Sequence, residues 1–587
     1  MHKRLLGLLA TAAIIMAACG GATTTTAPPA ASGPAPSGDA SAPPASGGLA
    51  AEQIVRIALP GEPPTLDPNT AQDANSLAVL RALHRPLVYI DKDLQVVDAL
   101  AESHEISADA KTLTFKLREA NYSNGEPIVA ADLVYSWKRL VDPRTAAPYS
   151  YVMAEVAGAG DLLAMAGADP ATPDAEVDAA LEKLGVAAPD DKTFVVTLDT
   201  PATYFLSAMT LWVGVPVQEK WITSAGATEA ANYVSSGPFI LDTWDHNSQI
   251  ILKPNPEWYG DVKPTLTEIQ MPMYAEPAAA QAAYETNEVD IIMPVASEDV
   301  PRVQEDPVMG AEFLSDPQLG ITYYNFNNGN DPTGKKKLAR CEDPKACPTA
   351  NKNFRIALTQ AIDKTAFQNA TFAGTGVVAG TMVMPGIPGA IEDYEPYPYD
   401  LDAAKAAMDT ALSELGYASA AEIPPLKFGF NSGSGHEPRV AFLAQAWSDA
   451  FGLQTEQIGS EFGVFLSQRT AGEYDLARNA WGADYPHANN QLAGLFTCGG
   501  GNNDQQYCNP AMDELITQAA SEQDPDAQAA LYEQANQMIA DDAASLFLRW
   551  GVSSQLVRPY VGSLQTTPMD SQVPGEHYYE SIQMLER

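Results

Sequence analysis

The segment Gly472–Pro510 limits most narrowly what this chain can fold into, because it reads as a strand that ends on a lone carboxylate. Its first residues alternate apolar and polar side chains, which predicts a strand that runs on through Trp481. Asp484 follows, and Pro486 stops the strand. A partly buried carboxylate needs a cationic partner, yet no Lys or Arg lies nearby after Arg478. Asp484 therefore either binds the amine of a ligand, or caps a turn or the following helix.

The N-terminus has the pattern of an export signal. Two basic residues precede the apolar run Leu5–Met16, which is too short to cross a membrane comfortably. The sequence Met-Ala-Ala-Cys that follows resembles a bacterial lipobox. We therefore expect residues 1–18 to be a lipoprotein signal peptide and Cys19 to be the lipidated residue; the alternative is an ordinary signal peptide with a coincidental cysteine. Residues 19–50 are mostly Ala, Pro, Ser, Thr and Gly, which predicts a disordered tether.

Length and charge narrow the class of protein. A chain of 587 residues is too long for one hydrophobic core, so we expect two or more lobes. The formal net charge of −40 argues against nucleic acid and anionic membrane surfaces as partners. It is compatible with cationic or zwitterionic ligands.

The four cysteines after position 19 fall into two local pairs, each within a loop: Cys341 with Cys347, and Cys498 with Cys508. In an exported protein this pattern predicts two short-range disulfides. The alternative is a single metal site made by all four, but neither pair has the C-x-x-C spacing of such sites. We therefore expect no metal.

Motifs of catalysis are missing from the sequence. It contains no phosphate-binding loop, no H-E-x-x-H and no G-x-S-x-G. Ser434 and His436 lie two residues apart, which does not make a catalytic triad. We expect neither an enzyme nor a cofactor.

Several segments resemble one family, the oligopeptide-binding group (family 5) of solute-binding proteins of bacterial ABC importers. Residues 475–485 follow its pattern D-x-A-R-x-x-W-x-A-D-Y, and residues 502–510 follow N-N-x-x-x-Y-x-N-P. The resemblance extends from Val55 to Gly562. His104 and Tyr122 replace two usual tryptophans, which we interpret as packing changes.

The resemblance implies an α/β fold of the periplasmic-binding-protein type II class, with two large lobes joined by hinge strands and an extra smaller domain (cluster C-like). The implied boundaries are residues 51–84, 218–320 and 551–587 for lobe I, 85–217 for the smaller domain, and 321–550 for lobe II. The hinge strands are expected near Pro216–Gln218, Ile321 and Trp550.

The resemblance also implies a binding site. Asp484 would bind the α-amino group of a peptide, and the strand 478–483 would supply backbone hydrogen bonds. Cations would meet the ligand carboxylate. The residues that it assigns are Asp484, Trp481, Gly482, Ala480, Arg478, Arg469, His436, Tyr149, Phe462 and Ala74.

Each assignment has a structural alternative: Trp481 fits the core, the two arginines fit packing or surface roles, and His436 fits a solvated loop. Phe462 stands where a pocket tryptophan is usual, and Ala370 stands where some relatives have a lysine for the ligand C-terminus.

The implied function is that of a lipid-anchored extracytoplasmic protein that captures peptides in a closing cleft and delivers them to an ABC permease. It would be a monomer on the outer face of the cell membrane or in the periplasm, touching the membrane only through its anchor. Alternatives are a same-fold binder of a nickel chelate, haem or oligosaccharide, and an enzyme or adhesin built on the scaffold.

Overall fold

The computed structural model describes residues 48–166, 173–296, 299–329, 341, 343–432 and 435–587. The expected signal peptide 1–18, Cys19 and most of the tether lie outside these residues. Within the described part of the chain, no helix combines the length and the apolar character needed to cross a membrane. The expected tether ends too late at residue 50, because Leu49 forms a bridge with Leu585 and the Ala50 N–H donates to Met584 O (2.8 Å).

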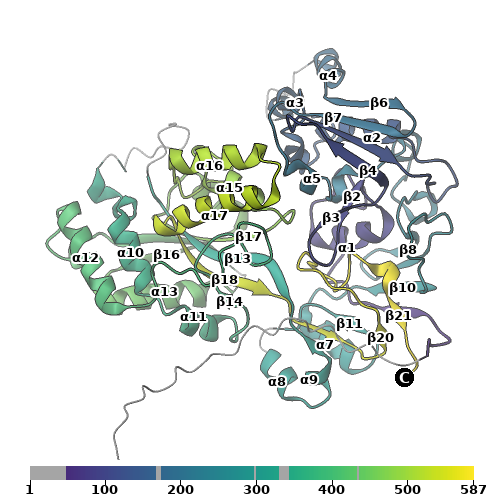
Figure 1. Cartoon of the computed structure of the whole chain (residues 1–587). Helices are drawn as coiled ribbons and strands as arrows, with labels where there is room; N and C mark the ends of the chain where they lie inside the picture. Colours follow the sequence, from purple (N-terminus) through teal and green to yellow (C-terminus); the bar gives the residue numbers. More distant parts are fainter. Residues whose placement is uncertain (1–47, 167–172, 297–298, 330–340, 342, 433–434) are drawn as a thin grey trace, which may run out of the picture. The chain divides into compact units, whose positions relative to one another are not determined.

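A first group of sheets combines segments from both ends and the middle of the chain (Figure 1). In its four-stranded sheet, the strand nearest the N-terminus pairs in parallel with a strand about 210 residues later. The strands, in sheet order, are β1 (Ile54–Arg56), β10 (Glu268–Pro272), β9 (Gln249–Pro254) and β8 (Phe239–Asp245); then β11 (Ile291–Ile292), β19 (Gln555–Val557) and β12 (Phe313–Leu314); then β20 (Val561–Gly562) and β21 (Gln583–Met584). The helices are α1 (Ala74–Leu83), α7 (Pro277–Glu285), α8 (Val300–Glu305) and α9 (Met309–Glu312).

A second sheet lies between residues 101 and 197 and shares its core with the first group. Its strands, in order, are β4 (Ala101–Ile106), β5 (Thr112–Leu117), β7 (Thr193–Thr197) and β6 (Val186–Asp190), preceded by the hairpin β2 (Val88–Ile90) and β3 (Val96–Asp98). Its helices are α2 (Ala130–Val141), α3 (Ala159–Ala166), α4 (Asp174–Leu181), α5 (Phe205–Ala208) and α6 (Glu219–Ile222). One hydrophobic cluster contains Phe115 and Trp137 of this part together with Ile269 of the first sheet. The expected smaller domain 85–217 stays a prediction, and one hydrophobic cluster runs across its expected boundaries. We call these two groups together the N-terminal half.

A six-stranded sheet organises the other half. Its strand order is β14 (Val377–Val378), β18 (Ser545–Val552), β13 (Pro317–Phe326), β17 (Leu476–Gly482), β15 (Leu426–Asn431) and β16 (Thr455–Ser460). Because strand side chains alternate between faces, neighbouring residues of β13 enter different cores. Tyr323 packs in the cluster of α15 (Ala488–Phe496), α16 (Pro510–Ser521) and α17 (Pro525–Asp541). Tyr324 packs in the cluster of α10 (Lys352–Gln360), α11 (Lys364–Thr371), α12 (Leu401–Leu415) and α13 (Glu437–Phe451).

The chain passes between the two halves along β13 and β18. These strands pair antiparallel, and their register places Ile321 opposite Trp550. Pro216–Gln218, the third expected hinge position, does not join the halves. Val217 is fully buried in the N-terminal core, and Gln218 hydrogen-bonds Asn124 of the same half (3.0 Å). The hinge expectation is wrong at that position because the segment packs inside one half.

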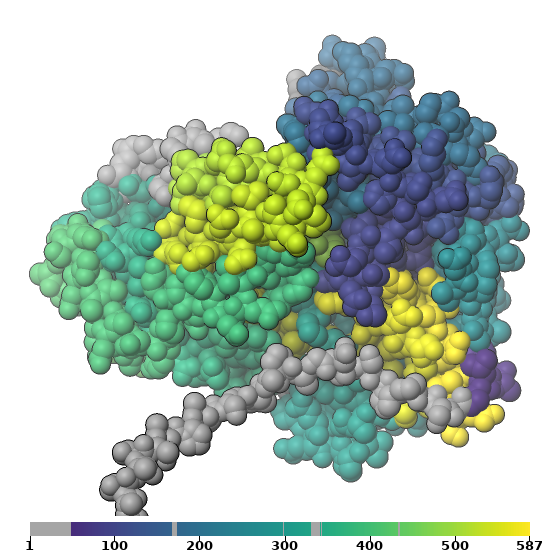
Figure 2. Space-filling view, viewed as in Figure 1, coloured from purple at the N-terminus to yellow at the C-terminus, as the bar shows by residue number. Residues whose placement is uncertain are grey.

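Two disulfides close short loops of the second half. The structure joins Cys341 to Cys347 and Cys498 to Cys508, with Cα atoms 4.9 and 4.5 Å apart. These are the two local pairs into which the sequence divides its cysteines. The second disulfide links the end of α15 to the start of α16. Figure 2 shows the surface of α16 as part of a continuous yellow-green area formed together with α17.

Candidate functional site

Asp484 lies where β17 leaves the six-stranded sheet. The Ala483 N–H donates to Leu319 O (2.8 Å) as the last pairing of the strand, and the chain then turns into α15. Asn490 in the first turns of α15 holds this turn: its Nδ2 donates to Asp484 Oδ2 (3.0 Å), and its Oδ1 accepts from the Asp484 N–H (3.1 Å). The N-cap of α15 is His487, so the helix-cap alternative for Asp484 does not apply.

Donors from the N-terminal half also reach the carboxylate. The hydroxyls of Tyr149 and Tyr151 donate to Asp484 at 3.3 and 3.5 Å, and the two tyrosine rings lie 5.3 Å apart. Desolvation raises the pKa of Asp484, and hydrogen bonds from Asn490 and the tyrosines partly oppose that rise. Within the described residues no cation forms an ion pair with Asp484. The arrangement is therefore one acidic group, held by neutral donors from both halves, that lacks a positive partner.

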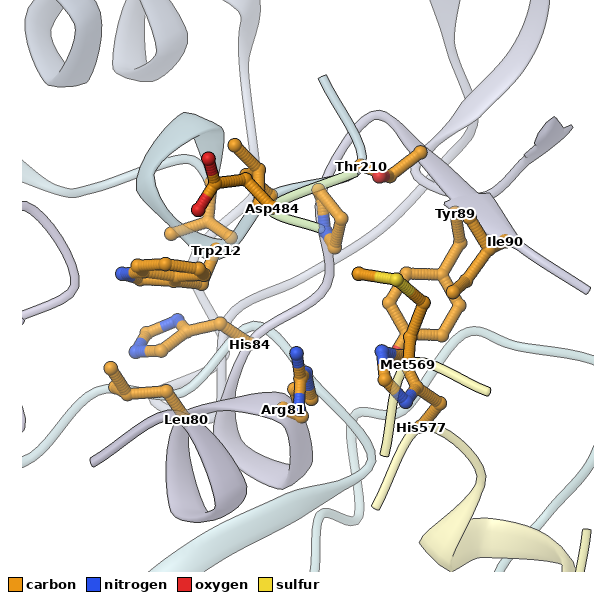
Figure 3. A pocket seen from close by; sticks show the side chains of 13 residues that line it. Leu80, Arg81, His84, Tyr89, Ile90, Thr210, Trp212, Asp484, Met569 and His577 are labelled. Carbon is orange, nitrogen blue, oxygen red and sulfur yellow. The ribbon is translucent and has the colours of Figure 1, made fainter. Parts of the chain in front are cut away.

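A pocket of the N-terminal half opens beside Asp484 (Figure 3). Trp212 lies on the Asp484 side of this pocket, and Met569 and His577 lie on the other. Arg81 contributes to the wall, but it contacts Glu576 and is thereby neutralised. No local sequence pattern marks this pocket. Its walls come from α1, from the segment after α5, and from a C-terminal loop almost 500 residues after α1.

The outer half of β17 has no neighbouring strand on one side within the described residues. Side chains meet two of its backbone groups there: the Ala480 N–H donates to Asn479 Oδ1 (2.9 Å), and Arg478 O accepts from Arg469 (3.4 Å). β15 pairs with β17 only at Leu476 and Ala477, so nothing in the described residues extends this pairing to positions 478–482. Because Ala483 bonds to β13, alternation directs the backbone groups of Arg478, Ala480 and Gly482 away from β13 and toward this edge. We call positions 478–482 the open edge of β17. An extended chain can add to such an edge by backbone hydrogen bonding.

A second pocket lies along the open edge. Its wall combines Arg478–Trp481 with α14 (Phe462–Thr470), where the Phe462 side chain is 51 % exposed. Arg469 points here but is already paired with Asp504 (2.9 Å) and donates to Asn479 Oδ1 (2.9 Å). Its charge is compensated within the protein, which supports a positioning role.

Trp481 belongs both to a core and to the wall of the second pocket, and the surroundings of His436 keep its imidazole neutral. Trp481 is half-buried against the α15–α17 core, and its Nε1–H donates to Asn490 Oδ1 (2.9 Å), so it supports the partner of Asp484. His436 is buried at the N-cap of α13, where burial and the charges of Arg478 and Arg439 lower its pKa to about 4. At neutral pH this imidazole carries no charge, so it is neither a solvated loop residue nor a cation for a ligand carboxylate.

Ala74 is the first residue of α1, whose N-cap is Asp73. Among the described residues it lines neither of the two pockets, although Leu80 and Arg81 of the same helix line the first. The expected contact of Ala74 with the ligand backbone stays a prediction.

One group of side chains in the described part of the chain has the proximity of metal ligands: Asp570, Glu576 and His577. Their carboxylates already accept hydrogen bonds from backbone N–H groups, Asp570 from Gly575 (2.7 Å) and Glu576 from Val573 (3.0 Å). His577 Nδ1 lies 2.7 Å from Asp570 Oδ1. Because the lone pairs face donors of the same loop, the group fits a self-bonded turn better than a metal centre.

Comparison with known proteins gives a consistent picture. The profile of the family described as bacterial extracellular solute-binding proteins, family 5 Middle, matches residues 95–503. The oligopeptide-binding protein OppA of Bacillus subtilis is 28 % identical over 502 residues, which cover 83 % of this chain and 86 % of that protein.

Solved structures share the fold. The murein tripeptide-binding protein MppA, in its unliganded open form, superposes with a TM-score of 0.75 at 24 % identity, over 92 % of this chain and 99 % of that one. OppA of Haemophilus influenzae in complex with the peptide RPPGFSPFR gives a TM-score of 0.69 at 25 % identity, over 92 % and 100 % of the two chains. The fold is thus the α/β type II binding-protein fold, and the chain belongs to family 5 of the bacterial extracellular solute-binding proteins.

Proposed function

We propose that this protein captures peptides as the substrate-binding protein of an ABC importer, and that Asp484 binds the ligand α-amino group. The observation that carries the proposal is the carboxylate of Asp484, which is held by neutral donors and lacks a cation among the described residues. A ligand ammonium would supply the missing charge and would return the raised pKa toward its ordinary value. The protein acts as a binder and not as an enzyme.

The open edge of β17 supports an extended ligand. Ala480 and Gly482 direct their backbone groups to this edge, so a peptide lying along it would gain strand-like hydrogen bonds that do not depend on its sequence. The Ala480 N–H donates to Asn479 Oδ1 (2.9 Å), so the ligand would replace that side-chain acceptor. A Cβ added at Gly482 would meet nothing within 4 Å, which leaves room for the ligand backbone to approach. Side-chain specificity would come from the pockets at Asp484 and beside Phe462.

Closure would bury the ligand. Tyr149 and Tyr151 approach Asp484 from the N-terminal half, so the amine site is complete only when the two halves are together. The strands β13 and β18 join the halves near Ile321 and Trp550, and bending there would open and close the site. The permease would then recognise the closed form.

The N-terminus supports delivery at a membrane surface. We infer that Cys19 carries a lipid, that residues 19–47 form the tether, and that the folded part begins at about residue 48. The protein would remain a monomer on the outer face of the membrane or in the periplasm and would meet the permease there. The curated relative from Bacillus subtilis carries the name of an oligopeptide-binding protein, which agrees with this ligand class.

Native mass spectrometry of purified residues 48–587 tests the proposal. A heterogeneous set of short peptides that co-purifies and dissociates on activation is the expected result. A clean protein whose melting temperature rises with a nickel chelate, haem or an oligosaccharide, and not with a peptide library, would overturn it.

A further inference from the structure

Four basic side chains gather at the N-terminus of α13. The Arg439 guanidinium lies 3.1 Å from His436 Nδ1. Arg439 and Arg549 both stack on the Phe372 ring, with guanidinium carbons 4.1 and 4.4 Å from its centroid. Arg478 lies close enough for its charge and that of Arg439 to act on the same imidazole. We call Arg439, Arg478, Arg549 and His436 the cationic cluster.

The cluster lacks carboxylate partners. Among the described residues, none of its three arginines forms an ion pair, whereas Arg85, Arg469 and Arg558 each pair with a buried carboxylate. The chain has 74 acidic and only 34 basic residues, so carboxylates are abundant. Glu437 is exposed beside the cluster and acts to raise the pKa of His436. The missing compensation is therefore a property of this cluster, because the chain as a whole has more acidic than basic residues.

Keeping these charges together costs free energy. Arg549 is only 9 % exposed, and burial followed by the charge of Arg439 lowers its pKa to about 10. The Nε of Arg439 is buried without a hydrogen-bond partner, and the Arg478 side chain donates no hydrogen bond within the described residues. Arg549 donates to Thr375 O (2.7 Å) and Thr375 Oγ1 (3.3 Å), which are neutral acceptors and leave its charge uncompensated. A bound anion stabilises partly desolvated like charges of this kind. The N-terminal end of the 15-residue helix α13 adds a positive potential at the same place.

Arg478 of the cationic cluster lies at the end of the open edge that is farther from Asp484. Arg478 precedes Asp484 by six residues, roughly 20 Å of extended strand. Ala480 of β17 lies opposite Thr322 of β13, and Thr322 lies opposite Arg549 of β18. Arg549 is therefore two strands, or about 10 Å, from the open edge. A peptide that has its amine at Asp484 and lies along the open edge directs its C-terminal end toward the cluster.

We propose that the cationic cluster binds two negative charges of the ligand, so that the preferred substrates are peptides with an acidic side chain at the C-terminal residue. The terminal carboxylate would bind Arg478, and the side-chain carboxylate would bind Arg439 and Arg549. A single carboxylate would compensate the charge of one of the three guanidinium groups and leave two charges uncompensated. His436 adds no charge, because its imidazole is neutral at neutral pH. This inference rests on the proposed capture of peptides through Asp484.

A ligand needs about six extended residues to span the roughly 20 Å between Asp484 and Arg478. Titration calorimetry of the whole mature protein with the hexapeptides Ala-Ala-Ala-Ala-Ala-Glu and Ala-Ala-Ala-Ala-Ala-Gln therefore tests the inference. The two peptides differ by a single charge, and we expect the Glu peptide to bind about tenfold or more tightly. Arg549→Gln and Arg439→Gln should each shrink this ratio. Lys405→Gln removes the same charge from an exposed position on α12 and should keep it.

Equal affinities of the two peptides for the unmodified protein would overturn the inference and leave peptide capture intact. Loss of the ratio in Lys405→Gln would also overturn it, because the preference would then arise from the overall field. If neither peptide binds, and no peptide library does, the proposed function itself is wrong and the inference falls with it. The comparison on the unmodified protein does not depend on whether either arginine variant folds.

Discussion

Replacing Asp484 with Asn should weaken peptide binding without weakening the fold. Removing one partner of a buried charge pair costs about 2–5 kcal/mol of binding. Asp484 is half-buried and keeps hydrogen-bond partners in Asn490 and Tyr149, so we expect the lower part of this range. A loss of about 2–3 kcal/mol corresponds to a Kd higher by roughly 30- to 150-fold.

The stability of this variant follows from the direction of the pKa shift. Burial raises the pKa of Asp484, so the folded state holds the proton more tightly than the unfolded state does. The stability that protonation contributes is present at low pH and is lost as the pH rises through the raised pKa. At neutral pH the ionised carboxylate therefore destabilises the free protein, and Asp484→Asn should melt at the same temperature or higher.

Titration calorimetry with a free and an N-acetylated form of one peptide measures how much the pairing of Asp484 with the ligand ammonium contributes to binding. Acetylation removes the ammonium and should cost the unmodified protein about as much as the substitution does. In Asp484→Asn, acetylation should have little further effect, because the two changes remove the same interaction. Asp526→Asn, at an exposed position in the first turn of α17, is the matched control and should bind normally. Equal Kd values for Asp484→Asn and the unmodified protein would refute the reasoning, as would an acetylation penalty that is the same in both.

Three further predictions concern pH, closure and anchoring. Peptide affinity should fall as the pH is lowered through the pKa of Asp484, because only the ionised carboxylate pairs with an ammonium. Burial places this pKa above the ordinary 3.8. Calorimetry between pH 7 and pH 4 should show the fall in the unmodified protein and not in Asp484→Asn. Thr203→Val removes a hydroxyl whose hydrogen bonds all cross between the halves, to Gln528 Nε2 (2.6 Å), Ala520 O (3.3 Å) and Glu522 O (3.3 Å), and should weaken binding by roughly fivefold. Thr410→Val, which loses only a bond within α12, should not weaken it. Identical affinities of Thr203→Val and the unmodified protein would rule out this contact as part of closure. Cys19→Ser should release the protein from membranes in a cell-fractionation assay, and continued membrane association would argue against the lipid anchor.

The elements of the half that contains the six-stranded sheet follow mainly from local sequence patterns. The strand β17 and its end before Asp484 are visible as alternation followed by Pro486. At this strand end the structure places a carboxylate that has no cationic partner among the described residues. The partners of the two disulfides are separated by 6 and by 10 residues along the chain, so each disulfide closes a short loop. Such features depend on interactions within a few residues, which one sequence is enough to reveal.

Other features depend on which distant side chains meet. Tyr151 and Trp212 of the Asp484 site lie hundreds of residues before it, and the pocket wall from Met569 to His577 comes after it. No local pattern marks these residues as neighbours. Residues of the expected smaller domain pack in one hydrophobic cluster with residues of lobe I. Such contacts join residues far apart in the chain, so they form only when the whole chain packs.

The sequence by itself determined the strand that leads to Asp484 and the need of that carboxylate, once buried, for a cation, because these depend on residue type and short spacing. The fold class followed from the resemblance of its motifs to a known family. Only the tertiary structure decided which charges are already satisfied. Arg469 is neutralised by Asp504, and burial among arginines makes His436 neutral. Arg439 and Arg549 become a site only because α13 and β18 bring them to the same aromatic ring. Charge compensation is a property of three-dimensional neighbours, and in this chain those neighbours are separated by up to several hundred residues.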